Sequence, residues 1–212
     1  MRVITVQTRG AVRRLEQQGT LTGDGRRTDH HFRPAYTVIR RWLAAHDPTY
    51  RGTPYPVWGW ALPPDGDIRE ILEEVADTLA ASQRNDPPSV VLSATVDDER
   101  VLRTCATCWH AVLNGHPATG DPHVVAAWEH WLDTTPQSRL LHPAVHAPQP
   151  LRRLLDRDWR HIIDQRCGCD PDLLGHVTFA RLHLSDVVAA VPLTAGDDPE
   201  RLAAALIAAS GS

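Results

Sequence analysis

The chain has 212 residues, of which 42% are hydrophobic and 23% are charged, and its formal net charge is −4. This balance is typical of a globular soluble protein and excludes a disordered chain, and the negative net charge without any basic run gives nucleic-acid binding no electrostatic support. The sequence contains no lysine, which excludes a lysine Schiff base, a lysine nucleophile and a phosphate-loop lysine.

Apolar periodicity and turn residues predict an irregular mixture of strands and helices. In chain order we expect a strand at Val3–Val6, a helix at Gly10–Gln18, a helix from Pro34, a strand at Tyr55–Leu62, a helix from Ile68 to Leu79 and a strand at Val90–Val96. There follow a helix that begins at Asp97 or Asp98 and runs through CATCWHAVLN to Gly115, helices at Val124–Leu132 and Leu151–Ile163, strands at Val177–Leu184 and Val187–Leu193, and a helix at Pro199–Ala209.

This order favours an α+β fold over a wound parallel sheet. We expect a single compact domain over residues 1–212, with mainly antiparallel small sheets packed with about six helices. No apolar run approaches the length of a membrane span, and the opening MRVITVQTRG is too weakly apolar for a signal peptide. The sequence therefore predicts a cytoplasmic protein with no membrane partner, whose cysteines stay reduced.

The four cysteines form two tight pairs, which are the strongest chemical signal in the chain. Cys105 and Cys108 stand in CATCWH, and Cys167 and Cys169 stand in CGC. Four thiolates from two short pairs are the ligand set of a structural zinc site, which is closed to substrate. The alternative is that Cys105 and Cys108 are small core residues. A redox CxxC is less favoured, because that motif starts a helix after a strand and the predicted helix places it mid-helix.

Twelve histidines are present, and none forms an HExxH or facial-triad pattern. His142 and His146 have a two-ligand helical spacing, but nearby prolines argue against a helix there. His110 is the most informative histidine, because it adjoins Cys108 and would either ligate zinc or face a pocket. A metal-dependent hydrolase that uses histidines is the least favoured functional class.

Tryptophan outnumbers phenylalanine and tyrosine combined, seven against five. Trp58 and Trp60 are expected to share one face of a strand, and Gly59 between them allows a ligand or another backbone to come close. Such a pair could stack a base or a sugar, although a core anchored on indoles explains it as well.

The helix predicted at Leu151–Ile163 is rich in charge. Its basic residues are Arg152, Arg153, Arg157 and Arg160, and they stand beside Asp156 and Asp158. This pattern predicts a salt-bridged, solvated surface, with a phosphate clamp as the alternative.

Taken in order, several segments resemble an uncharacterised bacterial family of domains of unknown function. They are an opening strand VITVQT that is similar to a TIQ-like strand, a YPxWxW segment, a WHxVLN segment, and the late strands VTFARLHLSDVVAAV. The matching residues are Thr5, Val6, Gln7, Tyr55, Pro56, Trp58, Trp60, Trp109, His110, Leu113 and Asn114. The family has Ser-Asp-like residues where Thr104 and Cys105 stand, so the cysteines look particular to this chain or its subgroup.

The resemblance also implies a loose similarity to ADP-ribosyltransferases, in which NAD lies in a cleft between two small sheets. On that analogy the cleft is lined by Gln7, Trp60, His110 and Asn114. The acidic residue that such enzymes carry in a late strand is missing near His176.

Two functional hypotheses follow. The first is a nucleotide or small-molecule binding protein, with an ADP-ribosyltransferase-like activity as its enzymatic form. Its pocket would be lined by Gln7, Tyr55, Trp58, Trp60, Trp109, His110 and Asn114. The second is a non-enzymatic interaction module stapled by zinc at Cys105, Cys108, Cys167 and Cys169. A structural protein with buried tryptophans and no site is the remaining alternative.

Overall fold

The fold is α+β, as the sequence predicts. The computed structural model describes residues 1–26, 28–52, 54–62, 67–73, 89–135, 142–163, 166–169, 175–193 and 197–210. The strands are β1 (Arg2–Thr8), β2 (Thr20–Leu21), β3 (Val57–Leu62), β4 (Ser89–Thr95), β5 (Val101–Cys105), β6 (Gly175–Phe179), β7 (Leu182–His183) and β8 (Val187–Leu193). The α-helices are α1 (Arg9–Gln18), α2 (Arg33–His46), α4 (Ala106–Leu113), α5 (Pro122–Thr134), α6 (Gln149–Arg160) and α7 (Pro199–Ser210), and residues 68–73 are also helical.

The chain divides into two compact units, each assembled from separate segments. Unit 1 comprises Met1–Gly23, Pro56–Val101 and Val177–Ser212, and unit 2 comprises Asp24–Tyr55 and Leu102–His176. The expectation of one domain over residues 1–212 stays a prediction. Within the described residues, no helix is long and apolar enough to cross a membrane.

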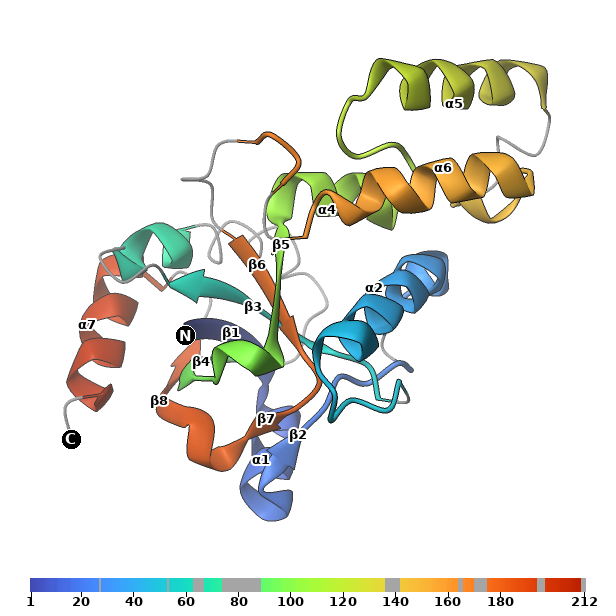
Figure 1. Cartoon of the computed structure of the whole chain (residues 1–212). Helices are drawn as coiled ribbons and strands as arrows, with labels where there is room; N and C mark the ends of the chain where they lie inside the picture. Colours follow the sequence, from blue (N-terminus) through green and yellow to red (C-terminus); the bar gives the residue numbers. More distant parts are fainter. Residues whose placement is uncertain are drawn as a thin grey trace. The chain divides into compact units, whose positions relative to one another are not determined.

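A six-stranded antiparallel sheet has the strand order β5-β6-β3-β1-β4-β8, and β2 pairs with β7 in a second, small sheet. In the larger sheet β1 lies between β3 and β4, so that Val3 stands opposite Ala61 on one side and Ala94 on the other. Within unit 1, β8 pairs with β4, and α7 packs against β8 (Figure 1). The helix α1 follows β1 directly, and the Thr8 hydroxyl caps it by accepting a hydrogen bond from the Ala11 N–H (3.2 Å).

The core of unit 1 forms where α1 covers the central strands. Leu15 of α1 is buried with Val3 of β1, Leu92 of β4 and Phe179 of β6 in one apolar cluster. The neighbouring residue Ile4 is also fully buried, on the opposite face of β1. Both faces of β1 and β4 are therefore covered, which explains why these strands read as nearly continuous apolar runs.

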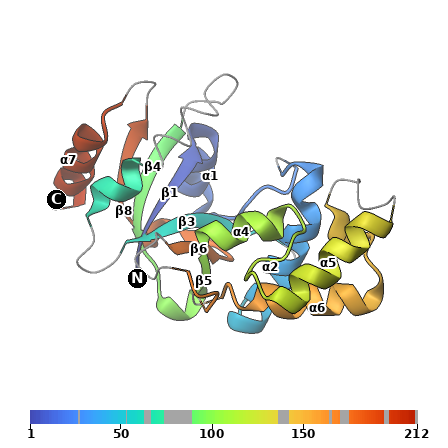
Figure 2. The same ribbon diagram turned by 90° about the horizontal axis from the view of Figure 1, so that it is seen from above.

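Unit 2 is mainly helical among its described residues. Figure 2 shows α5 running beside α6, and these two helices are in contact, as are α2 and α4. The end of α6 holds the loop that joins α4 to α5. The Asp158 carboxylate accepts hydrogen bonds from the Ala118 N–H (2.6 Å) and from the hydroxyl and N–H of Thr119, and Trp159 Nε1 donates to the His116 carbonyl (2.7 Å).

One predicted helix is wrong. Residues Asp98–Arg100 form only a 3-10 turn, Val101–Cys105 is strand β5, and the helix α4 begins at Ala106. The reason is a long-range pairing that no local pattern reveals. The Cys105 N–H donates to the Ile162 carbonyl (2.9 Å), and Thr104 forms a β-bridge with Ile163, so tertiary contacts override the helical periodicity.

Smaller differences concern segment ends. The late strand expected at Val177–Leu184 divides into β6 and β7, and the prediction missed β2, which β7 pairs with. Between the helices predicted at Val124–Leu132 and Leu151–Ile163, the described residues contain the short 3-10 helix η4 (Pro143–Val145), and α6 begins at Gln149, ahead of the predicted Leu151. The helix predicted from Ile68 does begin there, but its expected end at Leu79 lies outside the described residues.

Candidate metal centre

The first cysteine pair lies where a strand becomes a helix. Cys105 ends β5 and is the N-cap residue of α4, and Cys108 lies in the first turn of that helix. The predicted mid-helix position of this CxxC pair is therefore wrong, because β5 occupies the first half of the expected helix. Both side chains are buried, with 1% of Cys105 and 5% of Cys108 exposed.

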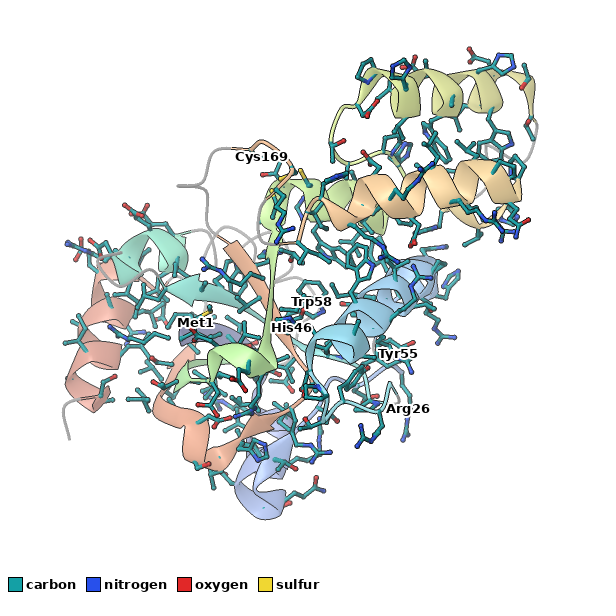
Figure 3. All side chains as sticks on the ribbon, in the orientation of Figure 1. Met1, Arg26, His46, Tyr55, Trp58 and Cys169 are labelled. Carbon is teal, nitrogen blue, oxygen red and sulfur yellow. The ribbon has the colours of Figure 1, made fainter. Side chains whose placement is uncertain are left out.

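The second pair lies in the loop that follows α6. Cys167 and Cys169 flank Gly168, whose φ of +78° belongs to the left-handed region that glycine adopts without strain. Both sulfurs of this pair lie close to those of the first pair, and Figure 3 shows Cys169 beside the start of α4. The loop is anchored to the first pair by the backbone bond from Cys105 to Ile162.

The four sulfur atoms form one cluster. All four Sγ atoms lie within 4.8 Å of one another, and Cys108 Sγ and Cys169 Sγ are 3.3 Å apart. A tetrahedral zinc ion with Zn–S bonds of about 2.3 Å separates its sulfur ligands by about 3.8 Å, so the observed spacing brackets that geometry. None of the four cysteines is in a disulfide. This buried cluster could hold a metal ion such as zinc.

The pKa values of the thiols differ because their surroundings differ. Burial raises the pKa of the Cys108 thiol well above its usual range, and its contacts with the other three thiols add to the effect. Burial also acts on Cys167, but a hydrogen bond from the Cys169 backbone and the neighbouring thiols hold the pKa of Cys167 below its usual value. The position of Cys105 and Cys108 after a strand and at a helix start is the one that a redox CxxC occupies, so the sequence argument against that alternative no longer holds.

A second possible group of metal ligands lies at the surface of unit 2. Asp29, His30 and His31 bring one ligand atom each within 4.8 Å of the others. Asp29 and His30 are exposed, and the Asp29 carboxylate already accepts a hydrogen bond from the His31 N–H (3.0 Å) as the cap of a 3-10 turn. This arrangement is explained by capping, whereas the cysteine cluster is not.

Three of the residues predicted to line a pocket lie in unit 1. Gln7 is used within the sheet, where its Nε2 donates to the Thr5 hydroxyl (2.8 Å), which in turn donates to the Trp58 carbonyl (2.5 Å). Trp58 and Trp60 alternate with buried neighbours along β3 and are half-buried on its other face. An added Cβ at Gly59 would lie 2.7 Å from the Ile4 carbonyl, so the close approach that this glycine permits is that of β1.

The other four predicted pocket residues, Tyr55, Trp109, His110 and Asn114, lie in unit 2. Tyr55 and Trp109 both contact the ring of Tyr36, at centroid distances of 5.5 Å and 6.4 Å. Asn114 is the C-cap of α4 and its side chain donates to the His110 carbonyl (2.7 Å), so its amide serves to end the helix. That all seven residues line one pocket stays a prediction.

The sequence reasoning missed Tyr36, which joins Tyr55 and Trp109 into an aromatic cluster. Tyr36 directly follows Ala35, a residue of the buried face of α2, and therefore lies at the edge of that face rather than within it. This position is the only indication of its role that the sequence offers. The Arg40 guanidinium lies 5.2 Å from the Tyr55 ring centroid and donates to the Tyr50 hydroxyl (3.3 Å). Aromatic and cation–π contacts in this cluster thus join α2 to Tyr55 and to Trp109 of α4.

No protein-family model, curated protein or solved structure matches the chain. The similarity to a bacterial family, and through it to ADP-ribosyltransferases, stays a prediction.

Proposed function

We propose that this chain is a zinc protein in which one Zn²⁺ is bound by the thiolates of Cys105, Cys108, Cys167 and Cys169. The observation that carries the proposal is the convergence of all four cysteines of the chain within 4.8 Å of one another. Random burial of small core residues gives no reason for two pairs from distant segments to meet. A shared metal ion supplies that reason.

The role proposed for the zinc is structural. Four thiolates complete a tetrahedral shell, so no coordination position is left for a substrate or an activated water. The ion would staple the junction of β5 and α4 to the loop after α6, and both of these segments belong to unit 2. The proposal is thus a non-enzymatic, zinc-stapled module, and it does not require the NAD-binding or transferase activity of the other hypothesis.

Metal analysis tests this proposal directly. We expect about one zinc per chain in protein purified without an added histidine tag, and an absorption spectrum of a tetrahedral all-thiolate site after replacement of zinc by Co²⁺. Cys169→Ser should lose most of the bound metal, because it removes one of the four ligands.

Two control variants separate this site from the alternatives. His30→Ala combined with His31→Ala should leave the zinc content unchanged, because the exposed Asp29 group is not the binding site. His110→Ala should also leave it unchanged if the ligand set is four cysteines rather than three cysteines and a histidine. Metal-free protein whose melting temperature does not respond to zinc or to a chelator would overturn the proposal.

A further inference from the structure

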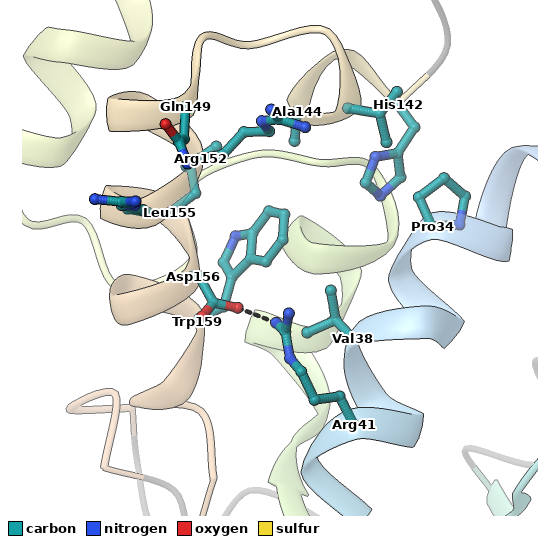
Figure 4. A pocket seen from close by; sticks show the side chains of 12 residues that line it. Pro34, Val38, Arg41, His142, Ala144, Gln149, Arg152, Leu155, Asp156 and Trp159 are labelled. Atoms are coloured by element: carbon teal, nitrogen blue, oxygen red, sulfur yellow. Dashed lines mark hydrogen bonds and ion pairs between the residues drawn. The ribbon is translucent and has the colours of Figure 1, made fainter. Parts of the chain in front are cut away.

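A cavity of about 400 Å³ lies in unit 2, in a size range that suits a small organic ligand. Its walls come from α2, from η4 and from one face of α6 (Figure 4). It contains none of the four cysteines and none of the seven residues that the sequence predicted for a pocket. The lining residues are Pro34, Val38, Arg41, His142, Ala144, Val145, Gln149, Arg152, Arg153, Leu155, Asp156 and Trp159.

The inner wall of this cavity is apolar. Trp159 is 5% exposed, and its Nε1 is already bonded to the His116 carbonyl, so the indole is fixed in place and offers its apolar surface. Figure 4 shows the indole of Trp159 facing Val38 of α2 across the cavity. The adjacent Val145 is 42% exposed and adds apolar surface to this wall.

The rim of the cavity is cationic. Three arginines line it against a single carboxylate, on a chain whose formal net charge is −4. That carboxylate, Asp156, is neutralised from two sides, because Arg41 forms an ion pair with it and Arg160 lies 3.5 Å from it. No salt bridge to Arg152 or Arg153 is found among the described residues, and both are exposed on α6. A concentrated positive charge on an acidic protein selects anions.

We propose that this cavity binds a small organic anion in which a flat apolar group carries a single phosphate or carboxylate. The apolar group packs against Trp159 and Val38, and the anion is held at the rim by Arg152 and Arg153. Guanidinium groups suit this task because their planar donor fork matches both phosphate and carboxylate oxygens. In this proposal Arg152 and Arg153 form a phosphate clamp, and the other arginines of α6 belong to the salt-bridged surface.

Three matched probes test the proposal by isothermal titration calorimetry on the full-length protein as purified. 1-Naphthyl phosphate carries both features, 1-naphthol carries only the apolar group, and inorganic phosphate carries only the anion. We expect 1-naphthyl phosphate to bind at least about tenfold more tightly than either of the other two, because its two groups are recognised together. Its affinity should fall as salt is added, because the rim charges are exposed to solvent.

Two kinds of variant locate the binding. Arg152→Gln combined with Arg153→Gln should weaken 1-naphthyl phosphate binding by about tenfold or more and leave 1-naphthol unaffected. The matched control is Arg157→Gln, which removes an exposed arginine of the same helix that does not line the cavity. Val38→Phe fills the cavity without changing charge and should weaken the binding of both naphthyl compounds.

The proposal is overturned if 1-naphthyl phosphate does not bind, or if it binds no better than 1-naphthol. It is equally overturned if the double arginine variant or Val38→Phe binds as the wild type does. Circular dichroism and the melting temperature of each variant establish that the protein remains folded. These outcomes are independent of the zinc proposal, because no cysteine is altered.

Discussion

At the scale of single residues, Gly115 and Gly120 have the same left-handed backbone in different surroundings. Their φ values are +72° and +71°. An added Cβ at Gly115 would lie 2.9 Å from Nδ1 of His142, whereas nothing lies within 4 Å of such an atom at Gly120. His142 cannot easily give way, because it is 6% exposed and its own φ is +51°. The contact, rather than the backbone angle, therefore distinguishes the two glycines.

Gly120→Ala is expected to lower the free energy of unfolding by about 1 kcal/mol, the cost of a left-handed alanine. Gly115→Ala should cost roughly 1–3 kcal/mol more, because the methyl group overlaps the His142 ring. Urea denaturation of both variants, followed by circular dichroism, measures the difference. Equal losses for the two variants would mean that His142 moves aside freely.

Burial also changes the pKa of two histidines. Desolvation lowers the pKa of His142 and, to about 4, that of His176, where the nearby His110 adds to the effect. Both imidazoles are therefore neutral at pH 7. Because these groups bind protons near pH 6.5 in the unfolded chain, the stability that their neutral forms contribute is present at neutral pH and is lost as the pH falls below 6.5, down to about 4 for His176.

At the scale of secondary-structure elements, α6 organises the helical part of unit 2 through consecutive residues. Asp158 and Trp159 together bind the loop of residues 116–119, although they point to different partners. Asp158 is only 3% exposed, which is rare for a carboxylate and is explained by the three donors that it satisfies. The connection between α4 and α5 thus depends on a residue of α6.

Asp158→Ala is expected to lower the free energy of unfolding by roughly 1–3 kcal/mol, because it leaves the Ala118 and Thr119 donors without their acceptor. Asp158→Asn should recover part of the loss, since its amide oxygen can still accept one of these bonds. Arg157→Ala, at the neighbouring exposed position, is the matched control and should change stability little. Thermal unfolding of the three variants at pH 7 provides the comparison. A loss for Asp158→Ala no larger than that of the control would contradict the proposed clamp.

Elements with strong local patterns were predictable, and those fixed by distant partners were not. The apolar run of β1, the Thr8 cap of α1 and the apolar periodicity of α7 are local, and the sequence predicted all three elements. The strand β5 was missed because its strand partner, β6 (Gly175–Phe179), lies far along the chain, and its periodicity is compatible with a helix. The cysteine cluster could be predicted, because the residue types themselves indicate metal binding. The cavity beside Trp159 could not, because it depends on how α2 and α6 pack.

At the scale of the whole molecule, the zinc proposal predicts which segments lose stability when the metal is removed. Chelation should raise amide hydrogen exchange in β5, in α4 and in residues 166–169, because these segments carry the ligands. The paired strands β1 and β4 in unit 1 should keep their protection. Cys169→Ser should show the raised exchange without chelator and no further response to it. Equal loss of protection in β1 and β4 would contradict a role confined to unit 2.

The interleaving of the two units has a consequence for biosynthesis. A nascent chain emerges from the ribosome in order, so β3 lacks its neighbour β6, and β4 lacks β8, until residues 175–193 have been made. The metal ligands are complete only when Cys169 has been synthesised. The six-stranded sheet is therefore expected to form only after β8 has been made, and shortened gene fragments that end before β6 should yield insoluble polypeptide with exposed strand edges.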